Sequence, residues 1–152
     1  MNPPPISSYH LVVANKDDGH LNLLSVFHYV IAGFHTFALL FLIGHYLLFR
    51  AIFTNEKVFE NSPEGPPPEA FMDIFIWFYV LGAFIITVIA VTNFLAARYL
   101  KQKKCKFFTM IVAGINCMNI PLGTVLGVFT FIVLLRPSVM ATYSEKSKFT
   151  GV

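Results

Sequence analysis

Gly114-Ile115-Asn116-Cys117-Met118-Asn119-Ile120-Pro121-Leu122-Gly123-Thr124-Val125-Leu126-Gly127 is the stretch that decides the fold. It interrupts an apolar run, from Phe107 to Leu135, that contains no Asp, Glu, Lys or Arg. Asparagine, proline and glycine favour turns and break regular helices. The chain therefore either continues here as one helix kinked at Pro121 or turns back as a hairpin of two short helices.

Charged residues are few and unevenly distributed along the chain. Of its 152 residues, 56% are apolar and 12% are charged, whereas a soluble domain carries about 25% charged residues. Two further runs, Leu21 to Phe49 and Ile74 to Ala97, also lack Asp, Glu, Lys and Arg. Each run exceeds the roughly 20 residues needed to span a bilayer, and none shows the polar face of a soluble helix. The sequence predicts an all-α integral membrane helical bundle.

Polar segments divide the chain into three predicted parts. They are a Pro-rich N-terminal segment, a transmembrane helical domain and a polar C-terminal tail, over residues 1–19, 20–137 and 138–152. The tail is expected to be poorly ordered. No secretory leader is predicted, because no basic segment precedes an apolar stretch with a cleavage site.

Turn-forming and acidic residues set the predicted helix boundaries. Asp17-Asp18-Gly19 is typical of a helix start, because aspartate caps free amides and offsets the helix dipole. The first membrane helix is therefore predicted from Leu21 to Ile52. A Pro- and Gly-rich loop over residues 54–69 leads to the second helix, which is predicted to end near Leu100.

The distribution of Lys and Arg favours the hairpin. Three crossings place the eleven basic residues six on one side and five on the other, whereas four crossings place nine on one side and two on the other. The second pattern obeys the positive-inside rule. It predicts two long helices plus a short Pro-turn hairpin, with both termini cytoplasmic, loop 54–69 on the outer side and Pro121 near the outer surface.

Helix length argues against the hairpin. Its arms, twelve residues to Met118 and fifteen from Pro121, cover only about 18 and 22 Å at 1.5 Å per residue, so a full crossing requires local thinning of the bilayer. The alternative is three helices with the last kinked at Pro121.

Two motifs resemble those of small bacterial membrane proteins. They are Leu21-Asn22-Leu23-Leu24-Ser25-Val26-Phe27-His28-Tyr29-Val30-Ile31-Ala32-Gly33 and the pattern from Asn119 to Phe129, followed by Val133-Leu134-Leu135-Arg136-Pro137. The chain thus resembles a family of small bacterial multi-pass membrane proteins of unknown function. The resemblance covers the membrane segments and implies a bundle of about four segments in a bacterial inner membrane, with no assigned reaction.

Two histidines, His28 and His35, are the candidate cofactor-binding residues. They lie seven residues apart on one face of the first helix, and ionisable residues in a membrane segment often mark functional sites. They cannot bind the same iron, because two turns separate them by about 10 Å, so haem would need a ligand from another segment or chain. The alternative is a histidine hydrogen-bonded inside the bundle to Asn93, Thr92 or Asn116. No metal site is predicted.

Small and amide residues are the candidate partner or packing residues. Gly123 and Gly127 form a small-xxx-small pattern that lets helices approach closely, and Gly114 can do the same. Amide side chains can bond neighbouring backbone or other helices; the three candidates are Asn93, Asn116 and Asn119. These residues serve either a partner protein or packing within the monomer.

The residue types present exclude several function classes. No Ser-His-Asp set, buried acidic pair, glycine-rich phosphate loop or zinc-protease motif occurs, so no enzyme is predicted. The net charge of +3 is too small and scattered for nucleic acid. The predicted partners are membrane lipids and other membrane protein subunits.

Three functions are consistent with these exclusions. The favoured interpretation is an accessory, assembly or stabilising subunit of a larger membrane complex, with no cofactor. The alternatives are a haem- or metal-binding electron-transfer subunit and a small oligomeric channel or transporter. Such a channel would be lined by Asn93, Asn116, Thr124 and Thr130.

Overall fold

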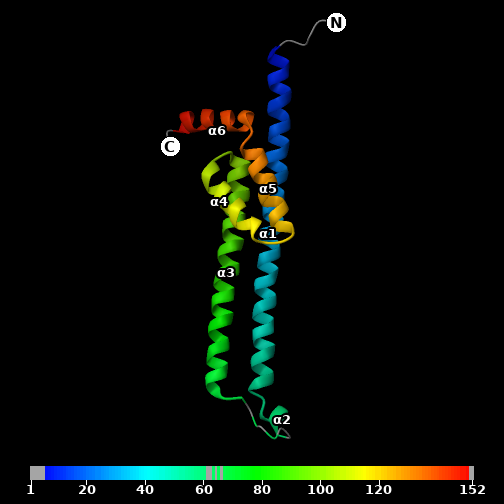
Figure 1. Ribbon diagram of the computed structural model, residues 1–152, viewed down its shortest axis with the longest axis vertical. Helices are drawn as coiled ribbons and strands as arrows, with labels where there is room; N and C mark the ends of the chain where they lie inside the picture. The colour runs from blue at the N-terminus through cyan, green and yellow to red at the C-terminus, as the bar shows by residue number, and fades with distance from the viewer. Residues whose placement is uncertain (1–5, 61–62, 64, 66, 151–152) are drawn as a thin grey trace. The chain divides into compact units, whose positions relative to one another are not determined.

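All regular elements in the described part of the chain are helices (Figure 1). The computed structural model describes residues 6–60, 63, 65 and 67–150. The helices are α1 (Ile6–Phe53), α2 (Glu56–Phe59), α3 (Glu69–Gln102), α4 (Lys106–Cys117), α5 (Leu122–Leu134) and α6 (Pro137–Thr150). The predicted all-α class is confirmed.

Two helical segments are long and apolar enough to cross a membrane. They are Lys16–Phe53 in α1, with 38 residues, and Ala70–Gln102 in α3, with 33 residues. Helices α5 and α6, bent by 71° at the break between them, would add a third segment if they formed one span. These lengths agree with the two long charge-free runs of the sequence.

The predicted start of the first helix at Asp17 is wrong. Helix α1 begins at Ile6 and passes through Asp17-Asp18-Gly19 without a break. The two aspartates therefore do not cap a helix end. Both instead form ion pairs with basic residues from later elements. The triple proline at residues 3–5 lies outside the described residues.

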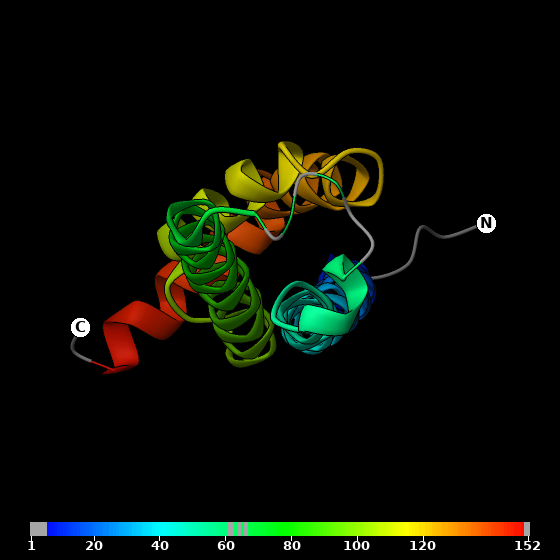
Figure 2. The same ribbon diagram turned by 90° about the horizontal axis from the view of Figure 1, so that it is seen from below.

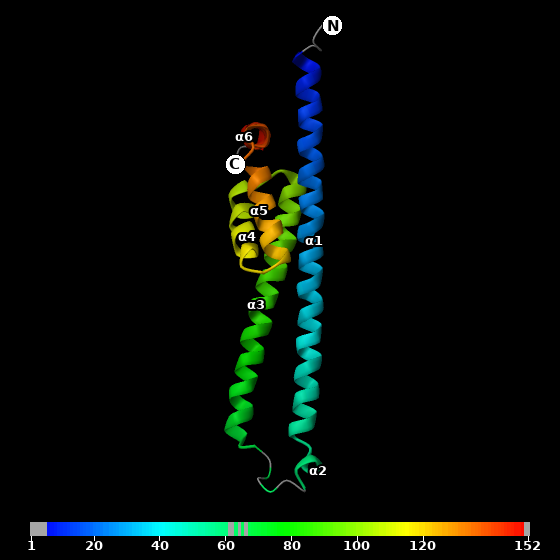
Figure 3. The ribbon, with the colours of Figure 1, turned by 45° about the vertical axis from the view of Figure 1, so that its right-hand side comes forward.

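The run from Phe107 to Leu135 forms two helices that turn back on each other. Helix α4 ends at Cys117 and α5 begins at Leu122, and the two lie side by side in each view (Figures 1, 2 and 3). The Ile120–Pro121 peptide bond is cis. The predicted Pro-turn hairpin is present, and the chain does not form one kinked helix here.

The C-terminal tail is helical, contrary to the expectation of poor order. Helix α5 ends at Leu134 and Pro137 begins α6, because proline is well suited to the first position of a helix. Val139 is fully buried and Tyr143 is 8% exposed, so this helix has an apolar side packed on the bundle. Burial raises the pKa of Tyr143 to about 12, so its hydroxyl stays protonated at neutral pH.

The chain divides into two compact units. The first unit combines residues 1–32 with residues 92–152, and the second contains residues 33–91. The first unit holds a core of apolar side chains from α1, α3, α5 and α6: Leu21, Leu24, Leu100, Leu126, Val133, Leu134, Val139 and Tyr143. Burial of such side chains is the main source of its stability.

Candidate functional site

A cluster of four buried polar side chains lies within the first unit. We call it the polar cluster; it consists of His28 from α1, Asn93 from α3, Asn116 from α4 and Thr130 from α5. None of the four side chains has any exposed surface. Buried polar groups must be hydrogen-bonded to be tolerated, and four separate helices supply the partners here.

The two asparagines form a reciprocal amide pair. Asn93 Nδ2 donates to Asn116 Oδ1 over 3.1 Å, and Asn116 Nδ2 donates to Asn93 Oδ1 over 2.7 Å. Each amide thus satisfies a donor and an acceptor of the other. The pair joins α3 to α4 across a buried contact, where an unmet amide would be costly.

His28 is held on both sides of its ring. Nδ1 lies 2.9 Å from Asn93 Oδ1, and Nε2 lies 3.3 Å from Thr130 Oγ1. The Thr130 hydroxyl donates to the Leu126 carbonyl over 2.7 Å, so its oxygen is left to accept from Nε2. The predicted hydrogen bond between His28 and Asn93 is present.

These contacts restrict the tautomer of a neutral His28. A neutral imidazole has one N–H donor, and the Thr130 contact uses it at Nε2. Nδ1 must then accept, and the donor that the structure places before it is Asn116 Nδ2, 3.4 Å away. The reciprocal amide pair in turn joins Asn116 to Asn93. The cluster is then a closed network with every member bonded.

The closed network bears on the two alternative functions. Haem ligation by His28 would require the ring to give up its contact with Asn93 or Thr130. The side chains proposed to line a channel, Asn93, Asn116 and Thr130, are fully buried and bonded within the cluster. Thr124, the fourth, donates to the Cys117 carbonyl over 2.9 Å within the hairpin.

The other predicted residues lie in different environments. His35 belongs to the second unit and is half-buried there. Asn119 lies in the hairpin turn, where its carbonyl accepts from the amides of Gly123 and Thr124. Among the described residues, no group of three or more His, Cys, Asp and Glu is placed to hold a metal ion.

Sequence reasoning missed Ser25 as a member of the same helix contact. Its hydroxyl donates to the Ala97 carbonyl over 2.8 Å, and the residue is 1% exposed. Ser25 and His28 lie three residues apart and so share one face of α1. This spacing of two polar residues in an apolar run was a signal that could have identified the face directed at α3.

Gly123 and Gly127 are packed inside the hairpin. A Cβ on Gly127 would collide with the backbone oxygen of Ala113, and one on Gly123 would collide with that of Asn116. Gly114 makes a looser contact, with the Phe131 ring 3.9 Å from its added Cβ. The small-xxx-small pattern therefore serves packing of α5 on α4 within the monomer.

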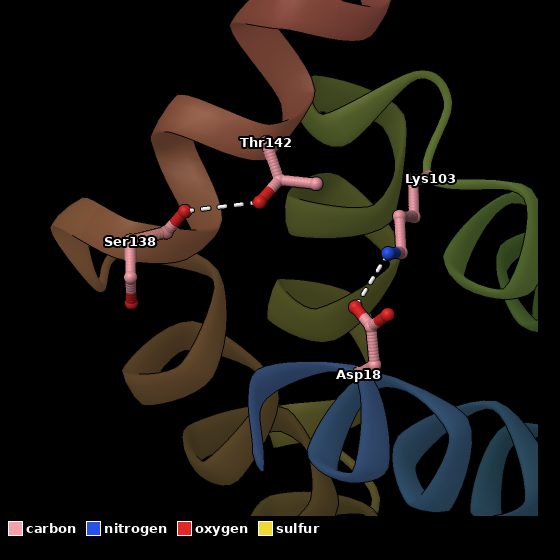
Figure 4. Close-up of polar contacts among 4 residues, drawn as sticks. All are labelled: Asp18, Lys103, Ser138 and Thr142. Atoms are coloured by element: carbon pink, nitrogen blue, oxygen red, sulfur yellow. Dashed lines mark hydrogen bonds and ion pairs between the residues drawn. The ribbon is translucent and has the colours of Figure 1, made fainter. Parts of the chain in front are cut away.

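Four charged residues meet at one end of the first unit. Lys103 donates to Asp18, and the two side chains point toward each other in Figure 4. The Arg136 guanidinium lies 3.5 Å from Asp17, whose side chain is only 9% exposed. We call these residues the charged end. They connect Asp17 and Asp18, in the N-terminal part of α1, to the turn after α3 and to the segment after α5.

Local contacts support the elements beside the charged end. Thr142 donates to the Ser138 carbonyl over 3.1 Å within α6 (Figure 4). Lys103 and Cys105 have φ angles of 53° and 48°, the left-handed conformation that reverses a chain between helices. The chain therefore turns tightly between Gln102, the end of α3, and Lys106, the start of α4.

Aromatic side chains organise the second unit. His45 Nδ1 lies 2.6 Å from the Tyr79 hydroxyl, and the Tyr46 and Tyr79 rings are 5.2 Å apart. An open cavity of about 220 Å³ adjoins them, lined by Leu42, Ile43, Tyr46, Ile76, Tyr79, Val80 and Ala83. Almost all of this lining is apolar, which suits hydrocarbon better than a charged ligand.

Comparison of the chain with protein-family models, with curated proteins and with solved structures gave no match. The site therefore has to be interpreted from its own geometry. That geometry is a closed polar network in the first unit and apolar, aromatic surfaces in the second.

Proposed function

We propose that this protein is an integral membrane protein that acts by contact, as an accessory, assembly or stabilising subunit of a larger membrane complex. The observation that carries the proposal is that polar side chains lie inside the molecule and apolar side chains lie on its surface, the opposite of a soluble protein. The polar cluster is bonded inside the molecule, whereas large apolar side chains face outward. Among the most exposed are Trp77, Phe78, Phe84, Phe37 and Phe41, each between 66% and 73% exposed.

The exposed apolar surface requires a cover that the chain does not supply. In the most apolar 18-residue window of the α3 segment, none of the residues is buried within the chain. Each exposed large apolar side chain gains about 1.5–3 kcal/mol when it is removed from water. Lipid chains and apolar helices of other subunits both provide such a cover, and they are the partners that we propose.

Two open glycines support a protein partner in addition to lipid. A Cβ on Gly33 or Gly44 would meet no atom within 4 Å. Eleven residues separate them, and three helical turns of 3.6 residues bring them almost to the same face of α1. Small residues on one face let a second helix approach closely in a membrane. These glycines are unused by the monomer, unlike Gly123 and Gly127.

The charged end supports a specific orientation. Its ion pairs join the part of α1 around Asp17 and Asp18 to the turn at Lys103 and to Arg136, just before α6, on one side of the first unit. Nine of the eleven Lys and Arg residues belong to segments on that side. Under the positive-inside rule this side is cytoplasmic, and loop 54–69 is then on the outer side. The resemblance to small bacterial multi-pass proteins agrees with this proposal and stays a prediction.

Purification from native membranes in a mild detergent tests the function. We expect the protein to elute with at least one different membrane protein. We expect Gly33→Leu and Gly44→Leu to reduce that association, because leucine fills the surface at which a partner helix would approach. Gly19→Leu is the matched control, since a Cβ added at Gly19 also meets no atom within 4 Å, but Gly19 lies before the membrane run. A chain that elutes only as a monomer would contradict the proposal.

A further inference from the structure

We propose that the α4–α5 hairpin is re-entrant: it enters the membrane from the charged end and turns inside the hydrocarbon, where its tip contacts acyl chains. The proposal rests on the proposed membrane insertion of α1 and α3. It differs from the expectation that Pro121 lies near the outer surface. Four observations carry it: length, the polarity of both ends, exposure at the tip and backbone hydrogen bonding in the turn.

Length is the first observation. Helix α4 has 12 residues and α5 has 13, which gives about 18 and 20 Å at 1.5 Å per residue. The hydrocarbon core is about 30 Å thick. Each arm therefore covers about two thirds of the core even if it stands upright, and tilt reduces the depth further.

The open ends of the hairpin are fixed at the charged end. Lys106 begins α4, and Lys103 just before it pairs with Asp18. At the other arm, α5 ends at Leu134 and Arg136 pairs with Asp17. Charged groups of this kind lie at or beyond the membrane surface. Because both arms start from the same polar side, a short hairpin ends within the core.

The tip is apolar and exposed. Met118 is 84%, Ile120 84% and Leu122 68% exposed, and Pro121 lies between them. A turn that emerged into water would be expected to carry polar residues at these outward positions. Large apolar side chains at a tip without any charge instead match hydrocarbon. Acyl chains are therefore the occupant to which we assign this surface.

Backbone groups in the turn are largely satisfied within the hairpin. Seven residues from Met118 to Val125 have a backbone N–H, and five of these donate to hairpin carbonyls: those of Met118, Asn119, Gly123, Thr124 and Val125. Pro121 has no N–H, and the Thr124 hydroxyl bonds the Cys117 carbonyl. Only the amides of Ile120 and Leu122 lack such a bond. Internal satisfaction is what a turn at membrane depth requires.

Cysteine labelling of the full chain in native membranes tests the depth of the tip. In a Cys117→Ala background, the exposed Cys105 reports the charged end. Single cysteines at Ile120→Cys and Glu60→Cys, with Cys105→Ser, report the tip and the loop side. The probe is a membrane-impermeant maleimide, applied to intact and to opened cells.

A re-entrant tip predicts a specific pattern. We expect Ile120→Cys to react at least about tenfold more slowly than Glu60→Cys in intact cells, and at least about tenfold more slowly than Cys105 in opened cells, because a thiol must ionise and meet the reagent in water. It should react normally after detergent denaturation. Labelling of the tip from outside at the rate of Glu60→Cys would establish a full crossing and overturn the proposal. Labelling from the charged-end side at the rate of Cys105 would overturn it equally.

Fluorescence quenching gives a second measurement of the depth of the tip, which does not depend on the reactivity of a cysteine. Trp77 is the only tryptophan, so Trp77→Phe with Ile120→Trp gives one fluorophore at the tip. In vesicles, lipids brominated deep in the acyl chains should quench it more than lipids brominated near the headgroup, and the reverse order would contradict the proposal. Extraction by alkaline carbonate, which releases proteins that are not inserted, separates failure of this inference from failure of the membrane proposal.

Discussion

At the scale of single residues, the polar cluster joins four helices through polar side chains, which are rare in the apolar runs of the sequence. His28 is the centre of this cluster, because its ring contacts Asn93, Asn116 and Thr130. Each contact joins two different helices. It therefore stabilises the arrangement of the helices and not any single helix. Hydrogen bonds between membrane helices contribute about 0.6 kcal/mol on average.

A double-mutant cycle on the amide pair measures this contribution. We expect Asn93→Ala and Asn116→Ala each to lower the free energy of unfolding, and the two changes to be non-additive by about 0.6–1.7 kcal/mol. The reason is that each single change leaves a buried amide without its partner. Unfolding in mixed micelles gives the four free energies.

Thr87→Ala is the matched control for that cycle. Thr87 Oγ1 donates to the Ala83 carbonyl within its own helix, and the residue is exposed. Its loss is expected to change stability by less than about 0.5 kcal/mol. Additive effects of Asn93→Ala and Asn116→Ala would mean that the pair does not contribute as described.

At the scale of elements, close contact between α4 and α5 is possible only because Gly123 and Gly127 have no side chain. The nearest atom that a Cβ would meet at each glycine is a backbone oxygen of α4, that of Asn116 or of Ala113, and backbone cannot rotate away as a side chain can. The spacing of the two glycines is visible in the sequence and predicts a close helix approach. Which helix approaches is set by the turn that precedes them.

Alanine substitutions at glycines provide a paired test. Gly127→Ala is expected to lower the free energy of unfolding by about 1–3 kcal/mol, as overpacking of a tight contact does. Gly44→Ala is expected to leave stability unchanged or to raise it by up to about 1 kcal/mol, because its Cβ meets no atom and alanine favours the helix. Thermal unfolding of both variants in the same detergent compares them. Equal effects at the two positions would show that the hairpin is loosely packed.

Element boundaries divide into those that local signals predict and those that tertiary contacts decide. The hairpin turn was predictable, because asparagine, proline and glycine act locally. The start of α1 was not, because Asp17 and Asp18 resemble a cap until Arg136 and Lys103 supply ion-pair partners far along the sequence. The order of the tail was also missed, since Val139 and Tyr143 become buried only against the assembled bundle.

The same distinction holds for the polar cluster. The hydrogen bond between His28 and Asn93 could be predicted, because a histidine inside an apolar run must find a polar partner, and few were available. The participation of Thr130 and the reciprocal geometry of the two amides could not be predicted. They depend on the rotation of each helix about its axis, which periodicity alone does not fix when a run is apolar on every side.

At the scale of the whole molecule, the charged end contains two ion pairs in different environments. Asp17 is nearly buried, with a side chain 9% exposed, whereas the side chain of Asp18 is 53% exposed. An exposed pair contributes little, while a buried carboxylate that loses its partner is costly. In addition, Asp17 Oδ2 is buried without a hydrogen bond in the described part of the chain.

Removal of the two cations should therefore have unequal effects. Arg136→Ala is expected to lower the free energy of unfolding by about 1 kcal/mol more than Lys103→Ala does. It leaves the more buried carboxylate, that of Asp17, without its ion-pair partner. Adding Asp17→Asn to Arg136→Ala should recover part of the loss, since the neutral amide is cheaper to bury. Unfolding of these three variants and of the unsubstituted protein provides the comparison. Failure of Asp17→Asn to improve the Arg136→Ala protein would contradict this account.

The division of the chain into two units has a consequence for the order of events during synthesis. The second unit, residues 33–91, is complete as soon as its own residues leave the ribosome, whereas the first unit joins residues 1–32 to residues 92–152. The ion pair between Asp17 and Arg136 can therefore form only after Arg136 has been translated. At about 5–20 residues per second this takes several seconds or more. In that interval the Asp17 carboxylate lacks the guanidinium that it contacts in the folded chain.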